Sequence, residues 1–132
     1  MKIACEDLIL LDVEFIRNLE YKEEEKEFPA KLEPIFGRNM DSEAKDSRLI
    51  LRLEIGERGN KEHPFYCRLA VAAIFNWNEL SEEAAEKEIM SVGVEIVSSF
   101  IRTYLYDLMQ KAGMEPMVLP PIFFGEINTY TE

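Results

Sequence analysis

The sequence predicts one α+β domain over residues 1–132, in which four strands are followed by one long helix. Three observations lead to this class. Before Asn78, four segments carry apolar residues at every second position, the spacing of a strand with one buried face. From Asn78 to Met109, apolar residues recur three and four positions apart, which is the spacing of a helix. Short loops favour antiparallel strands, and a sheet with one apolar face needs a helix to cover it.

The first two predicted strands differ in quality. The first runs from Ile9 to Leu19, and the residues expected on its apolar face are Ile9, Leu11, Val13 and Phe15. The second runs from Phe28 to Phe36 and contains Pro29 and Pro34. Because proline cannot donate to a strand ladder, this strand belongs at an edge. Between them, Glu20 to Glu27 carries a run of charges, interpreted as a solvated strand end or loop, with a recruiting site as the alternative.

The third and fourth strands show the clearest alternation in the chain. The apolar positions of the third are Leu49, Leu51, Leu53 and Ile55. Those of the fourth are Phe65, Cys67, Leu69, Val71, Ala73 and Phe75. The pair Gly59-Asn60, within a loop from Gly56 to Pro64, predicts a hairpin turn between these two strands.

The predicted helix has clear signals at both ends. Ser81 provides a hydroxyl for the N-cap, and Glu82 and Glu83 follow in the first turn, where the helix dipole favours negative charge. Gly113 is placed to end the helix, and Pro116 prevents its continuation. The helix should therefore run for about 28 to 31 residues, or about 45 Å, which is long for a small domain.

More of this helix is apolar than a single buried stripe requires. The additional apolar positions are Met90, Val92, Val94, Ile101, Tyr106 and Met109. A helix that is apolar over most of its circumference is usually buried on more than one side. One side can face the protein's own sheet, and we expect the other to pack against a second copy of the chain. The alternative is that short C-terminal segments cover it.

Composition limits the partners and the compartment. Apolar residues make up 47% of the chain, which is enough for a core. The net charge of −11 and the pI near 4.6 argue against nucleic acid and favour attraction to basic polypeptides. No run approaches the ~20 apolar residues of a membrane span, and the acidic start lacks the basic region of a signal peptide. We therefore expect a cytoplasmic protein without membrane insertion.

No catalytic or metal-binding motif stands out. The sequence has no glycine-rich phosphate loop and no serine or cysteine in a nucleophile motif. The single histidine, His63, precedes Pro64 in a turn and is expected to be exposed to solvent. Cys5 and Cys67 lack metal-ligand spacing, and Cys67 is interpreted as a buried small hydrophobe, with a redox role as the alternative. We expect no enzyme activity, no metal and no cofactor.

Apolar residues at strand ends and in loops beside the helix are the remaining candidates for a site. They are Phe28, Ile35, Phe36, Ile74, Phe75, Trp77, Ile122 and Phe123. Most of them can be ordinary core. Trp77 differs because it stands between Asn76 and Asn78, where a helix cap begins and burial is hard to complete. Beside the proline-rich segment Met117 to Phe124, it is a candidate wall for an apolar groove that binds a peptide or a hydrophobic ligand.

Several motifs occur in the order that they have in one known family. The most specific is Leu119-Pro120-Pro121-Ile122-Phe123-Phe124, which follows Gly113 and Pro116. The others are Pro29-Ala30-Lys31-Leu32-Glu33, Leu49-Ile50-Leu51-Arg52-Leu53, Phe65-Tyr66-Cys67 through Ala73-Ile74-Phe75, and Phe100-Ile101-Arg102. On these motifs, which extend over most of its length, the chain resembles the SecB family of protein-export chaperones.

The resemblance implies a Greek-key sheet packed on the long helix, and a dimer of dimers with the helices at the tetramer interface. It also implies an ATP-independent holdase that binds unfolded or precursor polypeptides in an apolar groove, with a role in protein export. The expected client contacts are Phe28, Ile35, Phe36, Phe75, Trp77, Ile122 and Phe123. Two alternatives stay open, a SecB-fold adaptor dedicated to one partner such as an antitoxin, and a structural oligomer without a client groove.

The chain departs from the family pattern in its helix and at its end. Ser99 stands where the family usually has a proline, so the helix is expected to run unbroken. Family chains continue past the Leu-Pro-Pro motif into a second helix and a tail, whereas this sequence ends at Glu132. We therefore expect one wall of the client groove to be short.

The positions that contact the SecA motor in the family also differ. Asp12 matches one of these positions. Ile16, Tyr66 and Arg68 stand where the family has a carboxylate, a leucine and a carboxylate. These differences argue against a SecA partnership.

Overall fold

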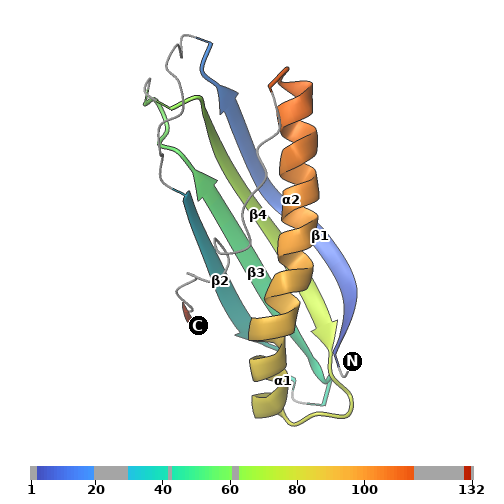
Figure 1. The fold of residues 1–132 in the computed structure, drawn as a ribbon. Helices are drawn as coiled ribbons and strands as arrows, with labels where there is room; N and C mark the ends of the chain where they lie inside the picture. Colours follow the sequence, from blue (N-terminus) through green and yellow to red (C-terminus); the bar gives the residue numbers. More distant parts are fainter. Residues whose placement is uncertain (1–2, 20–29, 42, 61–62, 115–129, 132) are drawn as a thin grey trace.

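The computed structural model describes residues 3–19, 30–41, 43–60, 63–114 and 130–131. The strands that come first are β1 (Ala4–Arg17), β2 (Ala30–Arg38), β3 (Asp46–Ile55) and β4 (Phe65–Asn76). One continuous helix follows, made of α1 (Glu82–Glu88), the π-helical segment η1 (Ile89–Gly93) and α2 (Val94–Lys111). The last described element is the two-residue strand β5 (Tyr130–Thr131) (Figure 1). The predicted class, α+β with four strands before one long helix, is confirmed.

The strands form one sheet with the order β1-β4-β3-β2-β5. β2, β3 and β4 pair antiparallel in succession, and β1 pairs antiparallel with β4. The first strand thus lies beside the fourth, which is the Greek-key arrangement that the resemblance implies. β2, expected at an edge because of its prolines, is the last strand of the antiparallel part, and β5 adds to it in parallel.

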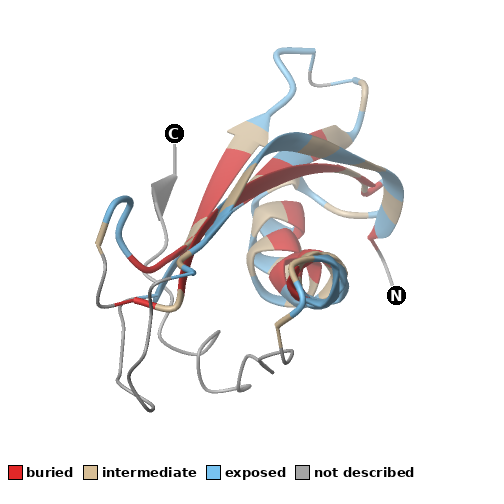
Figure 2. Cartoon of the chain, turned by 90° about the horizontal axis from the view of Figure 1, so that it is seen from above, coloured by how far each residue is buried: buried red, intermediate tan, exposed pale blue. Residues whose placement is uncertain are grey.

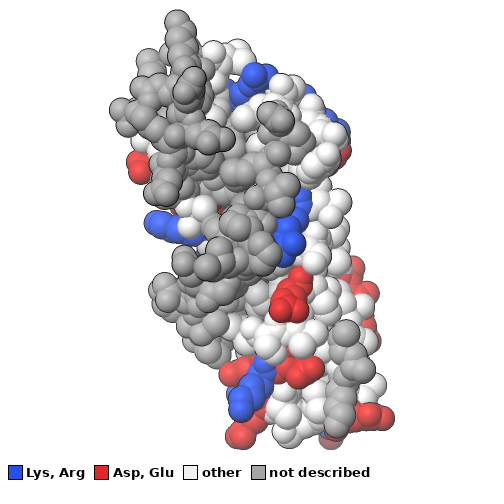
Figure 3. Space-filling model, viewed as in Figure 1, with Lys and Arg blue, Asp and Glu red and all other residues white. Residues whose placement is uncertain are grey.

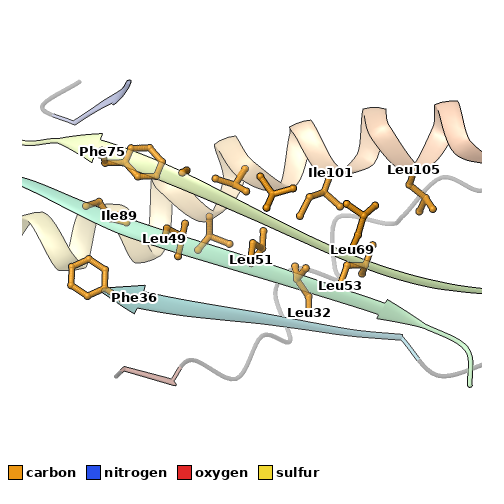
Figure 4. Close-up of a cluster of buried hydrophobic side chains, with 14 of the residues drawn as sticks. Leu32, Phe36, Leu49, Leu51, Leu53, Leu69, Phe75, Ile89, Ile101 and Leu105 are labelled. Carbon is orange, nitrogen blue, oxygen red and sulfur yellow. The ribbon is translucent and has the colours of Figure 1, made fainter. Parts of the chain in front are cut away.

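The helix covers one face of the sheet, so the domain has two layers (Figures 1 and 2). Leu53 of β3 and Leu69 of β4 are paired in register, and both are fully buried. Ile101 and Leu105 of α2 pack in the same apolar cluster (Figure 4). Burial of one such side chain contributes about 1.5 to 3 kcal/mol, so this cluster is what holds the helix to the sheet.

The strand β1 pairs with β4 along its length, but its register shifts twice. The second shift lies between Leu10 and Asp12. An extra residue in one strand inverts the faces of the residues beyond it. As a result, Val13 pairs with Leu69 on the face that carries the helix, whereas Ile9 lies on the outer face. The first strand does have one apolar face, as predicted, but Leu8 and Leu10 lie on it in place of Ile9, so the predicted membership of that face is partly wrong.

Both ends of the helix are capped as the sequence predicts. The Ser81 Oγ accepts a hydrogen bond from the Ala84 N–H at 3.2 Å. Gly113 follows the helix with a φ of 72°, a left-handed conformation that favours glycine. The Met114 N–H donates to the Met109 carbonyl at 2.9 Å, as in a Schellman motif. The helix begins at Glu82, directly after the predicted cap, and ends at Lys111.

The π-helical segment brings the helix close to β4. A Cβ atom on Gly93 would lie 3.2 Å from ring carbon Cζ of Phe75 and 3.2 Å from Cγ2 of Ile89, so only glycine fits there without adjustment. Within this segment, the Ser91 hydroxyl donates to the Lys87 carbonyl, four residues earlier, at 3.0 Å. Around Ser99 the helix α2 runs unbroken, as expected.

Candidate functional site

The predicted client contacts that the structure describes do not form an exposed surface. Ile35, Phe36, Phe75 and Trp77 are all buried in the single chain. Figure 4 shows Phe36 and Phe75 at the same end of the core, near Ile89. The other predicted contacts, Phe28, Ile122 and Phe123, lie outside the described residues. The four described residues thus stabilise the fold, and their contact with a client stays a prediction.

Trp77 is held by polar and electrostatic contacts as well as by packing. Its indole Nε1–H donates to the buried Ser47 Oγ at 3.0 Å, and its backbone N–H donates to the Lys45 carbonyl at 3.0 Å. The Lys45 ammonium lies 5.6 Å from the ring centroid, within cation–π range. The ring is only 4% exposed. The expectation of a partly exposed Trp77 is wrong, because the start of β3 supplies a partner for the indole N–H.

The exposed apolar residues gather instead on the edge strand β1. We call these four residues, Ile9, Leu11, Val13 and Ile16, the β1 strip. Each is well exposed, and Leu11 reaches 52%. Single exposed hydrophobic residues are ordinary, but four on one unpaired edge are an interaction surface or an aggregation hazard. Sequence reasoning missed the strip, although the consecutive apolar residues from Ile9 to Leu11 were a signal of two apolar faces.

A second apolar surface lies along the helix, where half-buried residues flank its buried stripe and pack against the edge of the core. We call its half-buried residues the outer helix face: Met90, Val92, Ile96, Phe100, Tyr104 and Leu108. Tyr106 is 46% exposed. Val94 and Ile101, by contrast, are buried in the core. The predicted surplus of apolar helix surface is therefore real, but it is narrower than the sequence suggested.

Ion pairs join arginines to several carboxylates on the outer face of the sheet. Arg68 Nε lies 2.7 Å from Asp12 Oδ2, and Arg58 Nε lies 2.8 Å from Glu14 Oε1. The side chains of Arg68 and Asp12 are each 46% exposed, so solvent screens this pair and it adds little to stability. Asp12, the residue that matches a motor contact of the family, is thus already bound to an arginine of its own chain.

A hollow of about 490 Å³ lies between these charged residues. It is lined by Leu11, Asp12, Lys31, Glu33, Arg52, Leu53, Glu54, Arg68, Leu69 and Ala70. The Tyr66 hydroxyl donates to Glu54 Oε2 at 2.9 Å beside it. The charges around the hollow are mixed, so it selects neither sign of ligand.

At the other end of the sheet, ion pairs join β2 to α1. Arg38 Nη2 lies 3.0 Å from Glu86 Oε1, and Arg38 Nη1 lies 3.8 Å from Glu82 Oε2. Figure 3 shows acidic and basic side chains side by side at this end of the molecule. These contacts orient the first turns of the helix over the end of β2.

The titratable residues that the structure describes do not form a cluster suited to catalysis or metal binding. His63 is only 8% exposed, and its Nδ1 accepts a hydrogen bond from the Glu57 N–H at 3.0 Å. The expectation of a solvent-exposed His63 is wrong, because its ring closes the β3–β4 turn. Burial raises the pKa of the Cys67 thiol to about 12, which fits a buried small hydrophobe. Among the described residues, no group of three potential metal ligands occurs, and no helix has the length and hydropathy to cross a membrane.

Comparison with known proteins gives one family and one well-matched fold. The family model described as "Preprotein translocase subunit SecB" matches residues 18–131. None of the curated proteins matches. The SecB-like chaperone Rv1957 of Mycobacterium tuberculosis, solved in complex with a ChAD peptide from the Rv1956 HigA1 antitoxin, is 18% identical, with a TM-score of 0.71 over 90% of each chain. A protein of unknown function from Streptococcus agalactiae is 16% identical, with a TM-score of 0.46 over 91% of this chain and 98% of that chain.

The fold and the family agree with each other. The Mycobacterium tuberculosis structure shares the arrangement of an antiparallel sheet and a long helix at a low sequence identity, which is evidence of a common fold. The family model covers most of the sequence, from the end of β1 to β5. The chain therefore belongs to the SecB family, which is a family of chaperones and not of enzymes.

Proposed function

We propose that this protein is an ATP-independent chaperone that holds extended apolar segments of other polypeptides. The observation that carries the proposal is the β1 strip, which places four exposed apolar side chains on one edge of a SecB-type sheet. The Mycobacterium tuberculosis relative is described with a bound peptide, which supports polypeptides as the clients of this fold. Phe28, Ile122 and Phe123 remain predicted contacts beyond the described residues.

Holding of this kind needs no nucleotide. Apolar area removed from water contributes about 25 cal/mol per Å², so contact between the β1 strip and an apolar client segment is favourable without chemistry. The contact is also reversible, because no covalent bond forms. The net charge of −11 attracts basic segments of unfolded chains and increases the rate of encounter.

The test is suppression of the aggregation of an unrelated unfolded protein, together with the affinity for it. Ile9→Ser with Leu11→Ser removes two exposed side chains of the β1 strip and should weaken client binding about tenfold, or about 1.4 kcal/mol. Glu6→Ser on the same strand, also exposed, is the matched control and should bind normally. If the double variant binds the unfolded client with unchanged affinity, the β1 strip is not part of the client-binding site.

A second function is favoured by one specific observation. The peptide in the Mycobacterium tuberculosis complex comes from an antitoxin, which supports an adaptor dedicated to a single partner. A dedicated adaptor should fail to suppress the aggregation of unrelated proteins while it still folds normally. The same assay therefore separates the general chaperone from the adaptor, and a structural oligomer without a client site would bind neither kind of polypeptide.

We further propose a cytoplasmic dimer or tetramer that forms through the outer helix face. Its half-buried apolar residues are a surface that a second copy can cover. Light scattering that finds a monomer at micromolar concentration would contradict this assembly. SecA is not proposed as a partner, because Asp12, the residue that matches a motor contact of the family, is already paired with Arg68. A role in export consequently remains a prediction of the family resemblance.

A further inference from the structure

The two edges of the sheet are occupied differently. Along β1, no described strand pairs with the edge that faces away from β4. Along β2, the edge that faces away from β3 carries β5, which pairs in parallel with Ile35 and Phe36. β2 has 9 residues and β5 has 2, so most of this edge has no strand neighbour among the described residues. An edge strand offers unpaired N–H and C=O groups to any extended polypeptide.

The part of β2 that pairs with β5 is the part of that edge most suited to the addition of another strand. Pro34 has no N–H to donate, and the pairing with β5 begins immediately after it. Lys31 and Glu33, on the other side of the proline, place charges along the edge, which is a common protection against strand addition. Ile35 and Phe36 are apolar and buried, so the backbone beside them is the place where an added strand meets the least charge.

The pairing is nevertheless weak. It involves two residues, and it is parallel, whereas every other pair of neighbouring strands in the sheet is antiparallel. Parallel pairing is slightly less stable per residue, and so short a strand forms few hydrogen bonds. β5 is kept near the edge mainly because it belongs to the same chain, which raises its local concentration. A client segment that pairs with more of β2 can therefore displace it.

We propose that β5 is an internal substitute for a client strand: it occupies the receptive edge of β2 and has to leave before an extended segment of another polypeptide pairs there. This inference rests on the proposed function. It makes the free edge of β2 a second binding surface, separate from the β1 strip, and it makes β5 an autoinhibitory contact. Only molecules in which β5 has left β2 can bind a client there, so the apparent affinity is the intrinsic affinity multiplied by the fraction of such molecules. Removal of β5 raises this fraction and therefore raises the apparent affinity.

The test uses the full chain with Tyr130→Pro and Thr131→Pro, which remove the backbone N–H groups of β5. Glu132→Pro, just beyond β5, is the matched control. The probe is fluorescently labelled, reduced and carboxymethylated α-lactalbumin, an unfolded polypeptide, and anisotropy gives its Kd. The double variant should bind about three- to tenfold more tightly than the unaltered protein, and the control should not change. A synthetic peptide with the sequence of residues 125–132 should compete with the probe for the double variant.

The outcomes separate this inference from the proposed function. Equal affinities of the unaltered protein and the double variant would overturn the autoinhibitory role and leave the chaperone function standing. Lack of competition by the synthetic peptide would also overturn the autoinhibitory role of β5 and would leave the chaperone function standing. If neither protein binds the probe while both fold normally by circular dichroism, the general chaperone function and this inference both fail.

Discussion

Two apolar regions of this domain contrast with each other, the cluster of Ile35, Phe36, Phe75 and Trp77 and the β1 strip. Trp77 was expected to be partly exposed and the other three were candidate client contacts that could be ordinary core, and all four are buried. The β1 strip was expected to lie partly in the core because its residues alternate along a strand, yet all four are exposed. Apolar character is the same in both regions. What differs is the position of the strand in the sheet.

The sheet order explains the difference. Phe36, Phe75 and Trp77 belong to the core that the helix covers, whereas Ile35 pairs with Ile50 on the opposite face of the sheet and is buried there. β1 is an outer strand that the helix reaches only in part, and its register shifts carry alternate residues to the other face. The end of β4, which has a strand neighbour on both sides, is thus better covered than the middle of β1, which pairs with a described strand on one side only.

The largest expected effect is on Trp77. Trp77→Ala should lower the free energy of unfolding by about 3 to 5 kcal/mol, because it empties a large buried volume and leaves Ser47 without its donor. Leu11→Ala on the β1 strip is the matched comparison and should cost less than about 0.5 to 1 kcal/mol. Chemical denaturation measures both. Equal costs for the two substitutions would contradict the contrast between the two regions.

The fluorescence of Trp77 sharpens the same contrast. It is the only tryptophan in the chain, so the emission reports on this residue alone. With the ring 4% exposed, the free protein should show blue-shifted emission that is protected from soluble quenchers. A red-shifted, quenchable emission would instead place the ring in solvent.

A smaller effect is expected from alkaline pH through Cys67. Burial raises its pKa from 9.0 to about 12, so the thiol stays protonated in the folded protein while the unfolded chain loses its proton. The contribution of the protonated thiol to the free energy of unfolding is fully present below pH 9, and it is lost as pH rises toward 12. Between pH 9 and about 10.5 the loss should be about 2 kcal/mol. Cys67→Ala should lose less stability over that interval, and parallel curves for the two proteins would contradict the assignment.

The smallest effect distinguishes neighbouring serines of α2. Ser98 is 1% exposed and its hydroxyl has no hydrogen-bond partner among the described residues. Ser99 is exposed, and its hydroxyl donates to the Glu95 carbonyl at 3.1 Å. Ser98→Ala should raise the free energy of unfolding by about 1 kcal/mol, because an unsatisfied buried hydroxyl is removed. Ser99→Ala should change it by less than about 0.5 kcal/mol. A destabilised Ser98→Ala would reveal a partner for this hydroxyl.

Local signals predicted the elements well. Ser81 and Gly113 mark the ends of the helix because each satisfies backbone groups only a few residues away. The alternation of β3 and β4 also predicted their buried faces, since each of these strands has a neighbour on both sides. These predictions needed no knowledge of distant parts of the chain.

The candidate site was predicted less well, for physical reasons that particular residues show. His63 is buried because its ring nitrogen turns back to the Glu57 N–H, a contact that depends on how the whole turn closes. Trp77 is buried because Ser47, thirty positions earlier, accepts its hydrogen bond. The shift between Leu10 and Asp12 moved half of the β1 strip to another face, and no residue type signals it.

The sequence by itself determined the α+β class, the order of the elements and the capped helix, because strand periodicity and helix caps depend on interactions between near neighbours. The resemblance of its motifs also led to the SecB family. Only the tertiary structure decided which apolar residues are core and which are surface. Exposure depends on strand order, on register and on the path of the helix, all of which join residues far apart in the chain. The β1 strip and the occupied edge of β2 follow from that arrangement.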